Sequence, residues 1–136
     1  MVDTNLTSVI NKTKGKLPSL PFVEMKEKIL GKGYELSISF VSPKESQKLN
    51  LTYRGKNNPT NVLSFELTKK SGELVLQPAC VKRDAKNFDM DYPNFLAFLL
   101  IHGMLHLKGM QHGSTMEKQE ARFKKIFGVT EIVNKK

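Results

Sequence analysis

An almost wholly apolar run, residues 95–101, leads directly into the chain's three histidines, His102, His106 and His112. The run is long enough to begin a buried helix and too short to span a bilayer. Residues four apart on a helix project from the same face, so His102 and His106 are expected one turn apart. A helix this apolar cannot lie on the surface, and the rest of the fold must therefore be built around it.

The segment after the predicted helix can bring the third histidine back to the first two. Gly109 lies three residues past His106, where a glycine can adopt the left-handed conformation and end the helix. Two imidazoles from one helical face and a third from the returning loop make an open tetrahedral site, typical of catalytic zinc. One histidine on an apolar helix is usually a core residue, but here all three fall within eleven residues. We therefore predict one Zn²⁺ per chain, bound by His102, His106 and His112.

The spacing H-x-x-x-H-x-x-G-x-x-H matches the ligand frame of the metzincin proteases, with one difference. Those enzymes carry a glutamate directly after the first histidine, where it acts as general base. The corresponding residue here is Gly103, whose lack of a side chain rules out proton transfer at that position. A metallopeptidase is therefore a disfavoured alternative.

The charge of the chain points to a polyanionic partner. Twenty-two Lys and Arg against thirteen Asp and Glu give 136 residues a net charge of +9. A basic protein of this size favours nucleic acid first and an anionic membrane surface second. A basic surface without any anionic ligand is the remaining alternative.

Length and cysteine usage bound the class of protein. We expect residues 1–136 to form a single domain. Cys80 is the only cysteine, so the chain has neither an internal disulfide nor a thiolate cluster, and we expect Cys80 in the core. The N-terminus lacks the layout of a signal peptide, so a soluble, cytoplasmic protein is expected.

The order of the predicted elements indicates an α+β fold. It mixes strands and helices without the regular alternation of a doubly wound sheet. We expect a small mixed sheet of about four strands, with helices packed around the histidine helix. The predicted strands are 2–10, 34–41, 62–67 and 73–77. The predicted helices are 21–30, 43–51, 79–88, a histidine helix capped by Asp91 or Tyr92, and a last helix from a capping box at 114–117 to 127.

Three of these segments carry predictions about individual faces. In strand 34–41 the residues expected in the core are Leu36, Ile38 and Phe40, and those expected to face out are Glu35, Ser37 and Ser39. Helix 43–51 should bury Leu49. Helix 79–88 should turn Val81, Ala85 and Phe88 inward.

Two segments resemble the YbeY family, bacterial single-domain metalloproteins that act as endoribonucleases in ribosomal RNA maturation. Residues 102–112 are similar to its H-G-x-L-H-L-x-G-x-D-H signature. Residues 49–65 are similar to its L-N-x-x-Y-R-x-K-x-x-P-T-D-V-L-S-F segment, and residues 72–76 to its G-D/E-I/L-x-I strand. Gln111 and Asn61 stand where the family usually has Asp. Both changes remove a carboxylate that could support the site, although neither removes an expected metal ligand.

The resemblance implies a zinc-dependent, single-strand-specific endoribonuclease that acts in 16S rRNA 3′ end maturation and ribosome quality control. It implies ribosomal RNA and the small ribosomal subunit as partners, with neither a membrane nor an obligate protein partner. It also gives Arg54 a catalytic or RNA-binding role, because a planar guanidinium suits a phosphate, unless Arg54 is a solvated loop residue. Lys56 and Lys108 are further candidate RNA contacts.

Two points stay open in the sequence. The general base is not assigned, although Glu66 and Glu73 lie on predicted strands and could face the site. The second open point is whether the protein is an enzyme, because a non-catalytic, zinc-containing ribosome-assembly factor would have the same basic surface.

Overall fold

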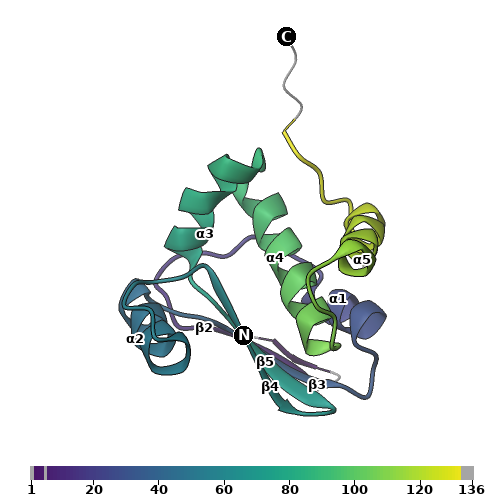
Figure 1. The fold of residues 1–136 in the computed structure, drawn as a ribbon, viewed down its shortest axis with the longest axis horizontal. Coiled ribbons are helices and arrows are strands. Elements are labelled where there is room, and N and C mark those ends of the chain that lie inside the picture. Colours follow the sequence, from purple (N-terminus) through teal and green to yellow (C-terminus); the bar gives the residue numbers. More distant parts are fainter. Residues whose placement is uncertain (1, 5, 133–136) are drawn as a thin grey trace.

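The computed structural model describes residues 2–4 and 6–132, which form one mixed sheet with helices on both faces (Figure 1). The strands are β1 (Val2–Thr4), β2 (Thr7–Asn11), β3 (Glu35–Phe40), β4 (Val62–Thr68) and β5 (Ser71–Leu76). The helices are α1 (Phe22–Ile29), α2 (Pro43–Arg54), α3 (Pro78–Ala85), the 3₁₀ turn η1 (Lys86–Phe88), α4 (Tyr92–Leu107) and α5 (Ser114–Ile126).

The strand order across the sheet is β1-β2-β3-β5-β4. The pairs β2–β3 and β3–β5 are parallel, whereas β1–β2 and β4–β5 are antiparallel. The predicted α+β class is therefore confirmed, with β2, β3, β5 and β4 as the body of the mixed sheet and the three-residue β1 added at one edge. At the other edge β4 pairs on one side with β5, and this edge strand borders the cleft described below.

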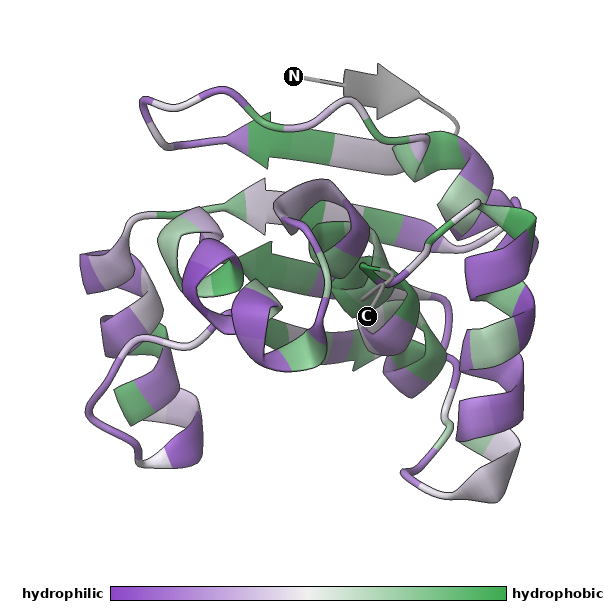
Figure 2. Cartoon of the chain, turned by 90° about the horizontal axis from the view of Figure 1, so that it is seen from above, coloured by the Kyte–Doolittle hydropathy of each residue, from purple (hydrophilic) through white to green (hydrophobic). Residues whose placement is uncertain are grey.

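The histidine helix α4 packs across one face of the sheet and is buried along ten of its residues. Asp91 caps its N-terminus by accepting a hydrogen bond from the Asn94 amide at 3.0 Å. Figure 2 shows long hydrophobic stretches on the strands, whereas the helices at the sides and in front alternate hydrophilic and hydrophobic turns. Within residues 2–4 and 6–132, no helix combines the length and the apolar character required to cross a membrane.

The alternation predicted for β3 is confirmed on the face toward α4, where Leu36, Ile38 and Phe40 are fully buried. On the opposite face the prediction for Ser39 is wrong, because this side chain is also buried. That second face carries a smaller apolar cluster of Val41, Leu63 and Val75, with Leu49 and Phe65 packed against it. Leu49 belongs to α2, so α2 covers part of the face that was expected to be open to solvent.

Helix α2 is three residues longer than predicted and ends at Arg54, because Gly55 takes the left-handed conformation with φ +68°. The side chain of Ser42 caps its start, accepting from the Glu45 amide at 3.2 Å. Leu49 is half-buried, and the buried α2 side chains are the polar Ser46 and Asn50. Hydrophobic periodicity could not identify these two residues, since their burial depends on partners in the following loop.

Three further predictions are corrected. The segment 2–10 holds two strands, β1 and β2, with Leu6 between them at φ +61°. Phe88 is 52% exposed and stacks on Phe95, with ring centroids 4.9 Å apart, because α3 gives way to η1 before this residue can turn inward. The expected capping box of α5 is not formed, since Gly113 occupies the N-cap and Ser114 is already helical.

Candidate metal centre and active-site cleft

The three histidines meet at the C-terminal end of α4. One nitrogen of each ring lies within 4.8 Å of the other two. His102 and His106 come from successive turns of α4, and their rings are 4.5 Å apart between centroids. Gly109, at φ +103°, lets the chain reverse after Leu107 and present His112, whose ring lies 4.7 Å from that of His106. The three side chains are thus placed to hold a metal ion together.

The hydrogen-bond partners of the first two rings indicate which nitrogens are free for a metal. Nδ1 of His102 lies 2.5 Å from a carboxylate oxygen of Glu120, and Nδ1 of His106 lies 3.1 Å from the Met110 carbonyl. Both partners are acceptors, so each Nδ1 carries the proton and donates it. The two Nε2 atoms then face each other as lone pairs only 3.1 Å apart. Two lone pairs at this distance repel unless a cation lies between them, so the donor set fits a metal ion of the kind that imidazole prefers.

Glu120 is a candidate site residue that sequence reasoning missed. It lies on α5, eighteen residues after its partner His102, and its side chain is only 14% exposed. A carboxylate that accepts from a ligating histidine holds the ring in one tautomer and one orientation. Its spacing from the histidines carries no motif, and the pairing exists because α5 packs back against α4.

The electrostatics of the cluster favour neutral imidazole at its centre. Burial, together with the neighbouring His102, lowers the pKa of His106 below its ordinary value, although the Met110 carbonyl acts in the opposite direction. A neutral ring is the form that ligates a metal, so the environment of His106 favours the ligating state.

Gly103 has a packing role between the two ligands of α4. A Cβ at this position would approach Leu74 Cδ2 to 2.7 Å, and Leu74 is fully buried in β5. The glycine therefore lets the ligand-bearing turn of α4 lie close against the sheet. A glutamate, the metzincin base, could enter here only if the core moved.

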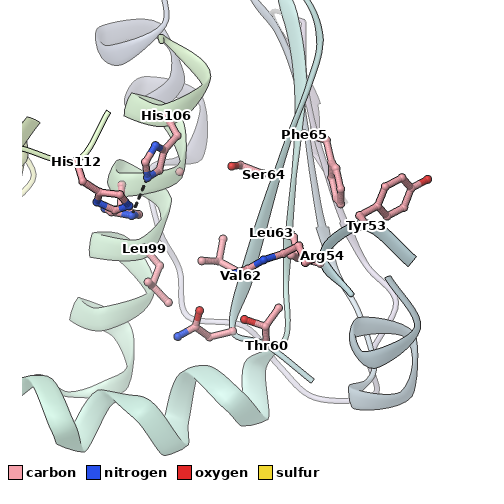
Figure 3. A pocket seen from close by; sticks show the side chains of 13 residues that line it. Tyr53, Arg54, Thr60, Val62, Leu63, Ser64, Phe65, Leu99, His106 and His112 are labelled. Carbon is pink, nitrogen blue, oxygen red and sulfur yellow. Dashed lines mark hydrogen bonds between the residues drawn. The ribbon is translucent and has the colours of Figure 1, made fainter. Parts of the chain in front are cut away.

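An open cleft of about 620 Å³ joins the histidines to the β4 edge of the sheet. Its residues are Tyr53, Arg54, Thr60, Asn61, Val62, Leu63, Ser64, Phe65, Leu99, His102, Gly103, His106 and His112. Figure 3 shows His106 and His112 on one side and Arg54 across from them beside β4. Of the three residues predicted to contact RNA, the structure thus places Arg54 in the same cleft as the metal ligands.

The loop that follows Arg54 is held down by side chains of α2. Buried Ser46 bonds both to the carbonyl of Thr60, at 2.8 Å, and to its amide, at 3.0 Å. Asn50 donates to the Asn58 carbonyl at 2.9 Å. These bonds fix the path from α2 into β4, so the wall of the cleft that carries Arg54 is anchored even though its surface is exposed.

The other predicted site residues lie elsewhere. Lys56 is exposed on the loop after α2, and Lys108 is exposed at the end of α4, and neither side chain lines the cleft. Glu66 and Glu73, the two open candidates for a general base, line a different cavity on the far side of β4. Cys80 is buried in α3, where burial raises the pKa of its thiol.

The two departures from the family signature differ in their surroundings. Asn61 lines the cleft and donates to a carboxylate oxygen of Asp84 at 3.0 Å, while the other oxygen of Asp84 accepts from Arg83 at 2.9 Å. An aspartate at position 61 would face Asp84 with a like charge, so the amide suits this chain's own neighbour. Gln111 is exposed.

Comparison with known proteins agrees with the two motifs. The family described as "Endoribonuclease YbeY" matches residues 9–131. Two relatives of that name are from Bdellovibrio bacteriovorus, 41% identical over 97 residues, and Alkaliphilus metalliredigens, 37% identical over 110 residues. The aligned regions cover 70% and 73% of this chain. They span 62% of the Bdellovibrio protein, which is less than two thirds of its length, and 71% of the Alkaliphilus protein.

The fold is also similar to a solved structure, the solution structure of TM1509 from Thermotoga maritima. The two chains superpose with a TM-score of 0.66 at 27% sequence identity, over 90% of this chain and 89% of the other. A family match from β2 almost to the end of the described chain, together with relatives above 35% identity, shows the relationship. This chain belongs to the Endoribonuclease YbeY family.

Proposed function

We propose that the chain is a zinc-dependent endoribonuclease that cuts single-stranded RNA at the histidine cleft. The observation that carries the proposal is the position of Arg54, which shares one cleft with three convergent imidazoles. Membership of the endoribonuclease family and the net charge of +9 support an RNA substrate.

The protein's own residues divide the work between binding the ion and binding the phosphate. His102, His106 and His112 would hold the ion through neutral imidazoles, which leave its double charge uncancelled. When bound, zinc supplies Lewis acidity toward the phosphoryl oxygen and toward the attacking oxygen. Arg54 can donate two parallel hydrogen bonds to a phosphate oxygen pair, and so both positions the diester and offsets the charge that grows on it.

Specific features distinguish this assignment from a metallopeptidase. Gly103, at the position of the metzincin base, packs against Leu74. The charged group facing the histidines across the cleft is the Arg54 guanidinium, which attracts an anionic substrate. The exposed hydroxyl of Ser64, which lies on the histidine side of β4 in Figure 3, can contribute a further hydrogen bond to the substrate.

At the level of the cell, the proposed substrate is ribosomal RNA of the small subunit. The role would be 16S rRNA 3′ end maturation and ribosome quality control, in the cytoplasm. The net charge of +9 supports a partner rich in phosphate, since counterion release favours binding of a basic protein to RNA. The relatives' names support the endoribonuclease step.

The test compares metal-loaded and chelated protein on single-stranded RNA, on a duplex of the same sequence, and on casein. Cleavage of the single strand that stops on chelation and returns with Zn²⁺ is expected. RNA affinity should survive chelation and fall as salt rises, because the phosphate contacts come from protein charges. Circular dichroism of the chelated protein controls for folding.

Two other results would redirect the assignment. Cleavage of casein and not RNA would make the chain a metallopeptidase. Salt-dependent RNA binding without cleavage by the zinc-loaded protein would make it a non-catalytic assembly factor.

A further inference from the structure

The ring of Tyr53 lies at the boundary between two cavities. Tyr53 is the penultimate residue of α2 and is 64% exposed. It lines the histidine cleft and also a second cavity, of about 350 Å³, on the other side of β4. Figure 3 shows Tyr53 and Phe65 together on that side, with Arg54 between them and the histidine side. The two cavities therefore adjoin at Tyr53 and Phe65, which line both of them.

Phe65 supports the Tyr53 ring. The ring centroids are 5.0 Å apart and the planes are inclined at 65°, the edge-to-face arrangement that aromatic pairs prefer. Phe65 is half-buried against the apolar cluster of Val41, Leu63 and Val75. Tyr53 thus presents a supported aromatic surface to solvent directly beside the phosphate-binding candidate Arg54.

The charges on the two sides of β4 differ in sign. The histidine cleft carries Arg54, whereas the second cavity is lined by Glu45, Glu66 and Glu73 together with Lys12. Lys12 is paired with Glu45 at 3.6 Å, so the cavity keeps an excess of negative charge. The phosphates of an RNA strand would be repelled there, and the part of a nucleotide that can turn toward Tyr53 is the uncharged base.

We infer that Tyr53, supported by Phe65, stacks on an unpaired base of the RNA strand whose phosphate Arg54 binds. Stacking on an aromatic side chain requires a base that has left its own helix, because both faces of a paired base are already covered. Tyr53 is therefore a specificity-determining residue that selects single-stranded RNA. This inference rests on the proposed endoribonuclease function.

The chain offers a direct optical test, because it contains no tryptophan. Tyr53→Trp keeps an aromatic platform and places the only tryptophan of the variant at the proposed base site, where its emission can be excited apart from that of the remaining tyrosines. The probe is a 2′-O-methyl oligonucleotide, titrated into zinc-loaded protein while its binding is followed independently by anisotropy. The expected result is a change in tryptophan emission with the single strand and none with an oligonucleotide of equal length made of abasic units, which keeps the phosphates and lacks the bases.

Phe88→Trp is the matched control. Phe88 is another exposed aromatic residue, at 52%, but it stacks on Phe95 near the other end of α4 and does not line the cleft. Its emission should not respond to either oligonucleotide. If the oligonucleotide binds by anisotropy and Tyr53→Trp emission stays constant, Tyr53 does not touch a base and the inference is wrong.

Two substitutions separate stacking from simple packing over Phe65. Tyr53→Phe retains the ring and should bind single-stranded RNA more tightly than Tyr53→Leu does. Tyr53→Leu retains apolar cover without a π-face and should lose about fivefold or more in affinity for the single strand. Its affinity for a duplex should not change. Wild-type affinity and cleavage in Tyr53→Leu would overturn the inference.

The results also distinguish this inference from the proposed function. RNA cleavage that is independent of Tyr53 would sink the stacking role and leave the endoribonuclease assignment standing. A wild-type protein that neither binds nor cuts RNA would refute both. A Tyr53→Trp emission change with a lysine-rich peptide, and none with RNA, would assign the acidic cavity to a protein partner instead.

Discussion

The two walls of the cleft are built in different ways. One wall, here called the helix wall, is the end of α4 with its histidines, and the other, the strand wall, is β4 together with the end of α2. On the helix wall, each ring of His102 and His106 is held by its own acceptor, and Glu120 is largely buried behind them. On the strand wall, Arg54 and Tyr53 are exposed, and the hydrogen bonds are made by the loop beneath them. A metal ion requires donors placed to within fractions of an ångström, so its wall must be preorganised. A long, flexible substrate can be met by side chains that order when it binds.

The largest effect is expected from a substitution that removes a metal ligand from the helix wall. His106→Ala removes one of three converging nitrogens, so the protein should lose its bound metal and with it RNA cleavage. Elemental analysis of the purified variant measures the metal content, and circular dichroism checks the fold. Gln111→Ala is the control, because Gln111 is exposed beside His112 and the variant keeps all three imidazoles. It should retain the metal. Equal metal content in His106→Ala and wild type would refute the ligand assignment.

A more subtle change on the same wall is Glu120→Gln. The amide can still accept from His102 Nδ1 but has lost the charge that favours that proton position, so metal affinity should fall about 10- to 100-fold. Competition with a chromogenic chelator measures it. Glu117→Gln, on the exposed face of the same helix, removes the same charge away from the ligands and should bind metal normally. If both variants bind equally, the Glu120 contact is incidental.

On the strand wall, Arg54→Gln should reduce kcat/KM for single-stranded RNA by about 10- to 100-fold, which corresponds to one lost hydrogen-bonded charge. Metal content and stability should not change, because the side chain is exposed and lies opposite the histidines. Lys48→Gln makes the same charge change on the exposed surface of α2 and is the control. A fall in metal content in Arg54→Gln would show that the two walls are not independent.

The loop under the strand wall gives a smaller effect on stability. Asn50 is 1% exposed and donates to the Asn58 carbonyl, so Asn50→Ala should cost about 1–3 kcal/mol in the free energy of unfolding. Chemical denaturation measures the loss, with Thr52→Ala on the exposed side of α2 as control. Because the loop leads into β4, the variant should also raise KM for RNA more than it lowers kcat. A variant with unchanged stability and KM would show that the wall needs no such anchor.

The smallest effect on RNA binding is expected from the exposed lysines outside the cleft. Lys56 and Lys108 are exposed and outside the cleft, so each Lys→Gln change should weaken RNA binding only slightly. If the lysines contact phosphates, the slope of log affinity against log salt should decrease by about one unit for each. An unaltered slope in the double variant would leave Arg54 as the nearer phosphate contact.

Much of this molecule follows from local rules that sequence alone expresses. An i, i+4 pair on an apolar helix must share a face, and a glycine three residues later permits the reversal that returns His112. Alternation places Leu36, Ile38 and Phe40 in the core for the same reason, since strand geometry repeats every two residues. The α+β class also follows, because the order of the elements excludes a doubly wound sheet.

The tertiary structure alone decided which of these segments meet. Glu120 reaches His102 because α5 folds back on α4. Arg54, the last residue of α2, shares a cleft with the histidines because the edge strand β4 packs beside α4. Burial of Ser46 and Asn50 depends on a loop that no periodicity describes, and Asn61 of the same loop pairs with Asp84 of α3. These contacts join residues 8 to 23 positions apart. The free energy of each depends on the packing of whole elements, which the pattern within a single helix or strand does not contain.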